Sequence, residues 1–438
     1  MCTTHFPPFF SLYRPREERG GLLIKGTFKM KKTLAALAVF GAFAGTAAAA
    51  DVTLYGLVDY GFNYQHVDGD AKDVDANDTF KMMSGQNSGS RFGLKGTEDL
   101  GNGLKLGFVL ENGFDADTGS LGNGGRLFGR ESQVNLQGAF GTVSFGRVGE
   151  LVSANGSYAL MGKASPFSGG WQDSVGQKFV YANGFDRYDN MITYVTPSFN
   201  GFKLHAQYSF KNDGKSGNGD EGKASADRYY AIGATFESQN LYLVGVVDSK
   251  NWGSVDTDVI DSGNHKIDDQ LSVTLGGAYD FGFMKLYASG QYFDNAKSVG
   301  TKAAGADGSI VTGYKFFSAY VADDKTTTPK DEEKAASGEG AEGYGINIGV
   351  GVPAFGGTAK AQIAYMDAEA VADSKLTVER WSIAVGYDYN LTKRTSVYTA
   401  AAYTRDKLSK EYRQSSFGEG YGENPSTVEV MAGLIHKF

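Results

Sequence analysis

The sequence predicts an all-β chain whose sixteen antiparallel strands close into a transmembrane barrel, and three observations carry that prediction. Apolar and polar residues alternate with a period of two through most of residues 51–438, as they do along β-strands. Tight turns and long polar loops follow one another in strict alternation. The alternating pattern also continues to the last residue, Phe438, whereas the ends of most domains fray.

The composition excludes several other classes of protein. The 438 residues include 61 glycines, 25 tyrosines and 29 phenylalanines, and this glycine content is about twice the ~7% of average proteins. Beyond the N-terminal region, no apolar stretch reaches the ~18 residues of a membrane-spanning helix. The single cysteine is Cys2, so disulfides and thiolate metal sites are excluded from the rest of the chain.

The N-terminal region has the pattern of an export signal. From Met30, two lysines precede an apolar run that ends in Ala48-x-Ala50 before Asp51, so residues 30–50 are predicted to be a cleaved signal peptide. Residues 1–29 are then a non-native upstream extension, and Met30 is the expected start. The first 50 residues hold seven Lys/Arg and two Asp/Glu, so the mature barrel of residues 51–438 carries a net charge of about −13.

The alternation places the strands in order along the mature chain. In GFKLHAQYSF, for example, apolar residues at 202, 204, 206, 208 and 210 alternate with polar ones. The predicted strands are Val52–Tyr64, Ser90–Glu98, Leu104–Gly113, Leu127–Gln137, Thr142–Arg147, Arg187–Val195, Phe202–Phe210, Arg228–Phe236, Leu241–Asp248, Gln270–Asp280, Met284–Phe293, Gly343–Val352, Thr358–Met366, Val378–Asp388, Thr395–Thr404 and Thr427–Phe438.

Seven tight turns and eight long loops account for the connections, which places the turns at one rim and the loops at the other, as in outer-membrane barrels. Unpaired strand edges are too costly in hydrocarbon, so the sheet must close on itself. The strand that ends at Phe438 is therefore expected to pair with the first strand, VTLYGLVDY. The apolar face then points to lipid, the polar face lines the interior, and sixteen strands leave room for an aqueous channel.

Three alternatives to this architecture or its use remain. A soluble β-sandwich of this length would need two domains, but no linker is present. A solute-specific channel of eighteen strands would use Ser309–Val321 as an additional strand. A surface adhesin or receptor barrel would carry its function in the long loops. Single-channel conductance separates the last two, because an adhesin passes no current and a specific channel passes a saturable one.

Several segments resemble the general trimeric porins of Gram-negative outer membranes, in their β-proteobacterial form. DVTLYGLVDYGFNY resembles the first strand of that family, GSRFGLKGTEDLGNGLKLGFVLENGFDADTG the second and third, and GRESQVNLQGAFGTVSFGR the fourth and fifth. The final HKF resembles the signal that the outer-membrane assembly machinery recognises, which implies that role for Phe438. The resemblance implies a homotrimer of water-filled barrels, set in the lipid bilayer beside lipopolysaccharide, that passes small hydrophilic solutes and ions.

The resemblance also implies that the third long loop, residues 148–186, folds inward as a constriction. The loop contains SPFSGG where many family members carry Pro-Glu-Phe-Gly-Gly, so this chain lacks an acid between Pro166 and Phe167. The loop acids expected near the constriction are Glu150 and Asp173. A weaker acidic side of the constriction is therefore expected.

The resemblance places arginines on the wall that faces this loop. Arg91 shares its strand face with Lys95, so both are expected in the lumen, and the same parity argument applies to Arg187. Arg130 matches the family position in FGRESQV, but strict alternation would turn it toward lipid, where an arginine costs ~2–4 kcal/mol. A bulge or an early strand end is therefore expected there. Arg147, the last residue of its predicted strand, is expected at the rim.

The expected lumen charges predict a modest preference for anions. Strand parity assigns nine basic and seven acidic side chains to the lumen, with Asp59 and Glu111 among the acids that offset the arginines. Charges in distant loops are screened beyond about 8 Å at physiological salt, so the local arginines should dominate.

No catalytic, metal or cofactor site is predicted. His205 stands alone on its strand face, and GNGDEG and GEGAEG match a phosphate-binding motif only by spelling, because no helix follows them. The acidic segments DVDAND and DDKTTTPKDEEK are expected to be solvated loops, with a cation site as the alternative. No nucleic-acid partner is expected.

Overall fold

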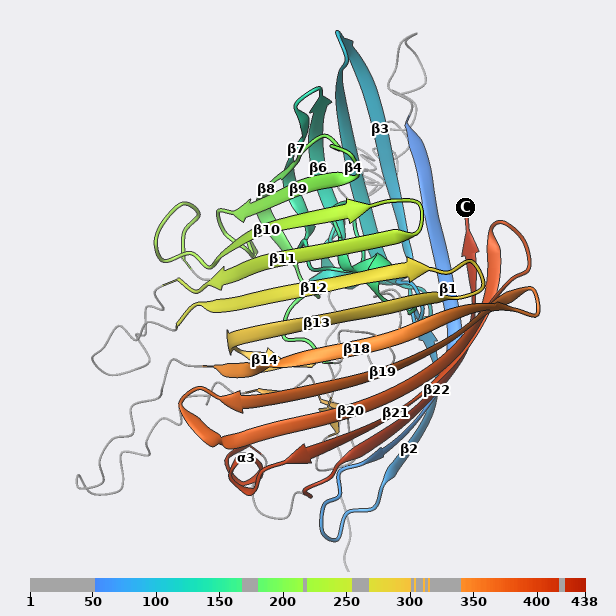
Figure 1. The fold of residues 1–438 in the computed structure, drawn as a ribbon, viewed down its shortest axis with the longest axis vertical. Coiled ribbons are helices and arrows are strands. Elements are labelled where there is room, and N and C mark those ends of the chain that lie inside the picture. The colour runs from blue at the N-terminus through green and yellow to red at the C-terminus, as the bar shows by residue number, and fades with distance from the viewer. Residues whose placement is uncertain are drawn as a thin grey trace, which may run out of the picture. The chain divides into compact units, whose positions relative to one another are not determined.

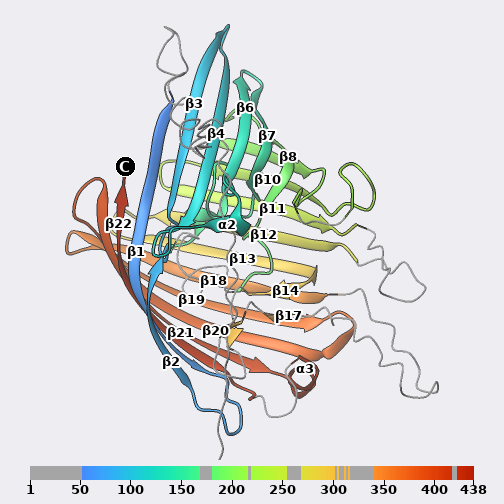
Figure 2. The same ribbon diagram turned by 180° about the vertical axis from the view of Figure 1, so that it is seen from behind.

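A computed structural model describes residues 52–167, 180–215, 219–253, 268–300, 303–304, 310–311, 314–315, 340–416 and 422–438. Sixteen antiparallel strands form one closed sheet within the compact unit Ala50–Phe438 (Figure 1, Figure 2). Along the ring, each strand pairs with the strands before and after it in the chain. The predicted all-β barrel is thus confirmed.

The second strand of the ring consists of two pieces, β2 and β3, which pair with successive parts of β1. The ring is built from β1 (Thr53–Asp68), β2 (Asn77–Ser84), β3 (Arg91–Gly101), β4 (Leu104–Asp115), β6 (Glu131–Gly138), β7 (Gly141–Gly149), β8 (Arg187–Val195), β9 (Phe202–Ser209), β10 (Arg228–Glu237), β11 (Leu241–Asn251), β12 (Gln270–Asp280), β13 (Lys285–Ala296), β18 (Ala341–Ala354), β19 (Gly357–Ala370), β20 (Asp373–Asn390), β21 (Thr395–Leu408) and β22 (Ser426–Lys437).

Short elements lie in the long loops. They are β5 (Ser120–Leu121), the helical turn α2 (Gly122–Gly125), the 3-10 turn η1 (Met161–Ala164), β14 (Ser298–Val299), β15 (Ala303–Ala304), β16 (Ile310–Val311), β17 (Tyr314–Lys315) and α3 (Lys410–Ser416). In the parts of the chain that the structure describes, no helix is long and apolar enough to span a membrane.

The first and last strands close the ring, as the sequence predicted. β1 pairs with β22 in register from Leu57 opposite Lys437 to Asp68 opposite Ser426. The final residue takes part in this seam, because the backbone nitrogen of Phe438 donates to the carbonyl of Gly56 at 3.0 Å. The nitrogen of Gly56 donates back at 3.1 Å. The chain therefore uses its last residue to complete the sheet.

The two faces of the sheet divide as the alternation predicts. Large apolar side chains such as Leu204, Ile232 and Leu275 are 56%, 61% and 63% exposed and point outward. Polar neighbours of opposite parity, such as Gln207 and Thr274, are buried. An apolar exterior over a polar interior is the pattern of a barrel in lipid, because the hydrocarbon takes the place of a hydrophobic core.

Several segments that were expected to be loops contain strands. β2 lies between the first two predicted strands and pairs with β1. Residues 367–377, expected to be a long loop, continue β19 to Ala370 and open β20 at Asp373, and these two residues are paired across a tight turn. This hairpin extends past the ends of the predicted strands. Its outward residues there include acids, so the alternation of apolar and polar residues that marks the other strands is absent. Of Ser309–Val321, the candidate additional strand, the structure describes β16 and β17, and these described residues pair with β15 and β14 and not with the ring.

The third long loop folds into the barrel, as expected, and its described residues take part in each of three packed clusters of the interior. We call residues 150–186 L3; residues 168–179 of it lie outside the described part. In the part of L3 that follows β7, Leu160 and Met161 pack with Tyr242 and Val246 of β11. The hydroxyl of Tyr242 donates to the carbonyl of Leu160 at 2.7 Å. The first half of L3 is therefore held against the wall from β10 to β12.

Glycines in the wall make room for the far part of L3. A Cβ on Gly386 in β20 would lie 2.7 Å from the ring of Phe167, and one on Gly349 in β18 would lie 2.6 Å from Cγ of Pro166. Both distances are shorter than side-chain contacts allow. L3 can approach this wall only because these two inward positions carry no side chain.

Candidate functional site

Two arginines surround one carboxylate on the wall formed by β1, β3, β4 and the start of β6. Nε of Arg130 donates to Oε1 of Glu111 at 2.6 Å, and Nη1 of Arg91 lies 4.0 Å from the same oxygen. The hydroxyl of Tyr55 donates to Oε2 of Glu111 at 2.9 Å. The three charged side chains keep between 10% and 15% of their surface exposed. Glu111 therefore offsets part of the positive charge that the arginines bring to this wall.

The inward position of Arg130 follows from where its strand begins. β6 starts at Glu131, so Arg130 precedes the strand and is not bound by its alternation. The backbone nitrogen of Arg130 donates to the carbonyl of Glu111 at 3.2 Å. Its Nη1 would lie 3.1 Å from a Cβ added to Gly89. The sequence predicted either a bulge or an early strand end that would turn Arg130 away from lipid, and the structure shows the early strand end.

Asp59 is enclosed in the wall and does not face the channel. Its Oδ2 accepts hydrogen bonds from the backbone nitrogens of Asn87 at 2.9 Å and Ser88 at 2.7 Å. Its Oδ1 accepts one from the hydroxyl of Tyr398 at 2.7 Å. The residue is fully buried. The carboxylate thus anchors the segment between β2 and β3, which leads directly into Arg91 at the start of β3.

Two other predicted residues lie away from this cluster. Lys95 is four residues from Arg91 along β3, roughly 13 Å at the usual rise of a strand. Its Nζ lies 5.0 Å from the centre of the Tyr55 ring. Phe438 lies at the β1–β22 seam, where its ring covers Gly56. The structure therefore separates Lys95 and Phe438 from the arginines of the wall.

A second charged group centres on Asp189 in β8. Nη1 of Arg147 donates to its Oδ1 at 2.6 Å, and Nη2 of Arg126 lies 3.2 Å from Oδ2. Arg126 also pairs with Asp213, and Nε of Arg147 donates to the carbonyl of Gly129 at 2.8 Å. β7 continues for two residues past Arg147, so this arginine lies close to the long-loop end of its strand but is not its last residue.

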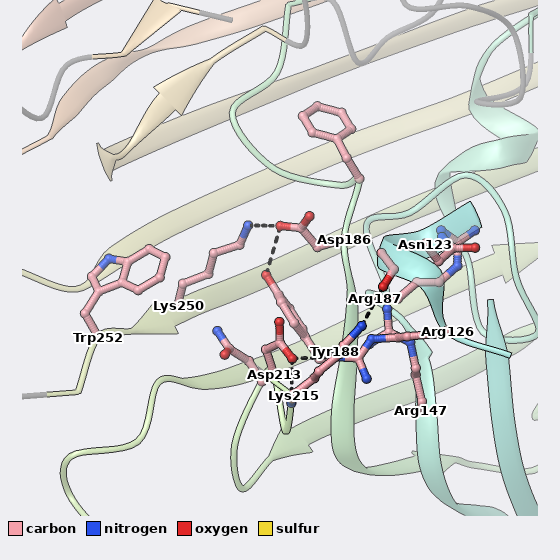
Figure 3. A pocket seen from close by; sticks show the side chains of 13 residues that line it. Asn123, Arg126, Arg147, Asp186, Arg187, Tyr188, Asp213, Lys215, Lys250 and Trp252 are labelled. Atoms are coloured by element: carbon pink, nitrogen blue, oxygen red, sulfur yellow. Dashed lines mark hydrogen bonds and ion pairs between the residues drawn. The ribbon is translucent and has the colours of Figure 1, made fainter. Parts of the chain in front are cut away.

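These groups open into a pocket of about 670 Å³ at the long-loop end of the strands (Figure 3). Two carboxylates, Asp186 and Asp213, line the pocket against five cations. The cations are Arg126, Arg147, Arg187, Lys215 and Lys250. Arg187 makes no side-chain ion pair with any residue that the structure describes. The pocket therefore presents an excess of positive charge beside the Arg91–Glu111–Arg130 cluster.

Glu150, the predicted L3 acid in the described part of the loop, pairs with one of these cations, because Nζ of Lys250 lies 3.8 Å from its Oε1. Glu150 is fully buried, with hydrogen bonds to the backbone of L3 itself. Pro166 and Phe167 lie against the wall glycines, and no acid separates them. Asp173 lies outside the described residues. The weaker acidic side of the constriction, expected from the missing glutamate, stays a prediction.

Four cations of the pocket were not among the predicted site residues, and one of these four, Arg147, was expected only at the rim. Arg126 and Lys215 lie in long loops, where the period of two gives no direction for a side chain. Lys250 lies two residues beyond the predicted end of its strand, and β11 in fact continues to Asn251. Continued alternation from Asp248 to Lys250 was the signal that could have placed Lys250 in the interior.

The arrangement of charges is suited to attracting anions. Fixed charges on low-dielectric walls raise the local concentration of ions of opposite sign. Among the described residues, no three His, Cys, Asp or Glu side chains are grouped so that they could hold a metal ion. His205, buried on its strand, contacts the hydroxyl of Thr235 at 3.1 Å.

Comparisons with known proteins agree with the barrel fold. Residues 33–409 match the model of the Gram-negative porin family. An outer membrane porin protein of Bordetella pertussis is 32% identical over 93% of this chain and 100% of its own length. Outer membrane porin protein 32 of Delftia acidovorans is 30% identical with the same coverage.

Solved structures show the same fold. An anion-selective porin from Comamonas acidovorans superposes with a TM-score of 0.55 at 24% identity, covering 89% of this chain and all of that one. The outer membrane channel DcaP of Acinetobacter baumannii gives a TM-score of 0.54 at 17% identity, covering 90% of this chain and 99% of that one. From its sixteen-stranded ring, its inward loop and the match over most of its length, the chain belongs to the Gram-negative porin family.

Proposed function

We propose that the protein is a general diffusion porin of the outer membrane that passes small hydrophilic solutes and ions, with a modest preference for anions. The observation that carries the preference is the uneven placement of charge around the channel. Basic side chains gather on the wall and in the pocket beside it, whereas Glu150 of L3 is buried in the loop. An anion that enters from the long-loop end meets this positive region first.

The net charge of the whole chain does not contradict a local preference for anions. The mature chain carries about −13, but a charge more than a Debye length of about 8 Å from the solute is largely screened at physiological salt. Charges on a narrow, low-dielectric wall act on the passing ion with little screening. The solved Comamonas structure is that of an anion-selective porin, which is in line with this proposal.

The working form that we propose is a homotrimer in the outer membrane, in contact with lipid and lipopolysaccharide. Export would use residues 30–50 as a signal peptide, with cleavage before Asp51, and residues 1–29 would not be part of the native protein. Phe438 would serve as the signal for the assembly machinery. Mass spectrometry of outer-membrane material should find an N-terminus within about two residues of Asp51, and material that retains residues 1–29 would contradict this part.

The zero-current potential of the purified protein in a planar bilayer across a KCl gradient tests the preference. The wild type should give the sign of an anion-preferring channel. Arg91→Ala combined with Arg187→Ala should lower the chloride-to-potassium permeability ratio by at least about twofold, because these charges act at the channel wall. A cation-preferring wild type, or a double variant with an unchanged potential, would contradict the proposal.

A matched variant separates local charge from net charge. Lys407 is an exposed residue of β21 whose Nζ pairs with Glu379 at 2.8 Å. Lys407→Ala also removes a positive charge, but far from the basic pocket, so its potential should equal that of the wild type. The same recordings address the alternatives: a current that saturates with one solute indicates a specific channel, and the absence of current indicates an adhesin or receptor.

A further inference from the structure

The two ends of L3 meet at one buried carboxyl group, that of Glu150. The backbone nitrogens of Gly184 and Asp186 donate to Oε2 and Oε1 of Glu150, each at 3.1 Å. The backbone nitrogen of Glu150 donates to the carbonyl of Asp186 at 3.4 Å. Glu150 is fully buried. A single side chain therefore connects the first residue of L3 to its last three; we call Glu150 and residues 180–186 the L3 stem.

A lysine from the barrel wall fixes this stem from the side. Nζ of Lys250 in β11 lies 2.8 Å from Oδ2 of Asp186 and 3.8 Å from Oε1 of Glu150. The hydroxyl of Tyr188 donates to the same carboxylate of Asp186 at 3.3 Å. Figure 3 shows Lys250 and Tyr188 directed at Asp186 from two sides. The stem is thus attached to β11 and β8.

The returning half of the stem is held by further buried polar groups. Nδ2 of Asn183 donates to Oδ2 of Asp248 at 2.6 Å, and the hydroxyl of Tyr229 donates to that oxygen at 2.9 Å. The side-chain oxygen of Gln291 accepts the backbone nitrogens of Ala182 and Asn183 at 2.9 and 3.0 Å. Buried hydrogen bonds of this kind are costly to break, because the groups that lose a partner stay desolvated.

The rest of the described loop is held by apolar contacts and by separate hydrogen bonds to the wall. The hydroxyl of Ser157 donates to Oε2 of Glu131 at 2.5 Å, and the hydroxyl of Ser165 donates to Oε1 of Gln362 at 3.1 Å. Each of these bonds attaches one point of the loop, whereas the carboxyl group of Glu150 joins the two ends of the loop to each other. The stem therefore fixes where L3 leaves the wall and where it returns to it.

We propose that Glu150 is a positioning residue that holds L3 against the barrel wall and so keeps the channel open. It acts through the stem, not by touching a solute, because its carboxyl group is buried. When Glu150 is replaced, L3 gains freedom to move into the lumen under an applied voltage. This inference rests on the proposed channel function and names the group that sets the position of its constriction.

The environment of Glu150 gives this role a pH dependence. Burial raises the pKa of Glu150 from 4.5 to about 8; Lys250 opposes the increase, and Asp186 and Asp248 add to it. Tyr188 and Tyr229 are the other titratable groups packed around it. A released stem would expose the carboxyl group to water, where its pKa returns to about 4.5. Between these values the attached stem retains a proton that the released stem loses, so attachment weakens as the pH rises from about 4.5 to 8.

Single-channel recordings of the full-length trimer test the inference. Glu150→Ala removes both acceptors and should raise the closed fraction at a fixed voltage at least about tenfold, as expected when buried hydrogen-bonding groups lose their partner. The open-state potential in a KCl gradient should not change, because no charge on the channel wall is removed. Normal closure in Glu150→Ala would overturn the inference, and a wild type that passes no current would overturn the proposed function instead.

Glu150→Gln supplies a milder variant and a signature that a purely structural role would not produce. Glutamine keeps the size of the side chain and one acceptor oxygen but does not titrate. The closed fraction of the wild type should increase from pH 5 to pH 8.5, whereas that of Glu150→Gln should stay constant. If the pH dependence survives in Glu150→Gln, another group causes it and the inference fails. Lys163→Ala, which removes an exposed L3 cation, is the matched control and should titrate like the wild type.

Discussion

The two sides of the barrel interior differ in what holds them. From β1 to β8 the wall carries ion pairs, with Glu111 between two arginines and Asp189 between two more. From β10 to β21 the wall carries the glycines, apolar residues and buried polar groups on which the described part of L3 packs, together with the buried pair of Arg380 and Asp406. The barrel interior is therefore asymmetric: the first side carries the clustered arginines near the pocket, and the second side supports the loop that narrows the lumen.

The seam between β1 and β22 joins these two sides, and its removal should have the largest effect. Deletion of Phe438 removes two backbone hydrogen bonds to Gly56 and the ring that covers that glycine. The closed sheet then has an incomplete edge, which lipid cannot satisfy. The yield of folded trimer in the outer membrane should fall at least about tenfold, measured by heat-modifiable mobility in gels. An unchanged yield would show that the last residue is dispensable.

Filling the space under L3 should disturb the loop-bearing side alone. Gly386→Ala places a methyl group 2.7 Å from the buried ring of Phe167, so overpacking should cost about 1 kcal/mol or more and push L3 into the lumen. Lower thermal stability and lower single-channel conductance are the expected results. Gly351→Ala is the matched control, because its nearest neighbours would be at 3.6 Å, an ordinary contact. Equal effects of the two substitutions would contradict the assignment of Gly386.

Removing the carboxylate of Glu111 should increase the positive charge of the arginine-bearing wall. Glu111→Gln leaves Arg91 and Arg130 without their shared carboxylate but retains an oxygen that can accept a hydrogen bond. The chloride-to-potassium permeability ratio should rise by about twofold, since one negative charge leaves the wall. The loss of this largely buried pairing should also reduce stability by roughly 1–3 kcal/mol. A potential that moves toward cation preference would contradict the proposed field.

The smallest effect is expected from an exposed ion pair between the loop and its wall. Nζ of Lys163 in L3 lies 2.6 Å from Glu237 of β10, and both side chains are more than half exposed. Exposed pairs contribute about 0–1 kcal/mol, so Lys163→Ala should leave stability and voltage-induced closure within error of the wild type. A large change would mean that surface charge, and not the buried stem, holds the loop.

How much of this could be predicted from the sequence depends on where the period of two applies. This period predicted most of the strands, the closure at Phe438 and the inward direction of Arg91. It did so because residues that face lipid must be apolar, so the residues that alternate with them face inward. It failed beyond the membrane, where the β19–β20 hairpin carries acids on a surface that no lipid constrains. It also had no rule for loop residues, which is why Arg126 and Lys215 were missed.

Residues at the ends of strands show a second limit of such prediction. The inward position of Arg130 required an irregularity whose form depends on one hydrogen bond to the carbonyl of Glu111. Glu150 was expected as a constriction acid, yet the backbone nitrogens of its own loop surround it. A sequence shows that such a residue is acidic, but only the path of the loop decides whether water or backbone meets the carboxyl group.

The wall glycines have a consequence for exchanging parts between related barrels. Gly349 and Gly386 belong to strands, but the residues they accommodate, Pro166 and Phe167, belong to L3. If only the loop is moved into a barrel with larger residues at those two positions, these residues occupy the space that the loop needs. If a loop with smaller residues is moved into this barrel, a void remains beside the two glycines. In engineered chimaeras of this family, the loop and these two distant glycines therefore have to be transplanted together.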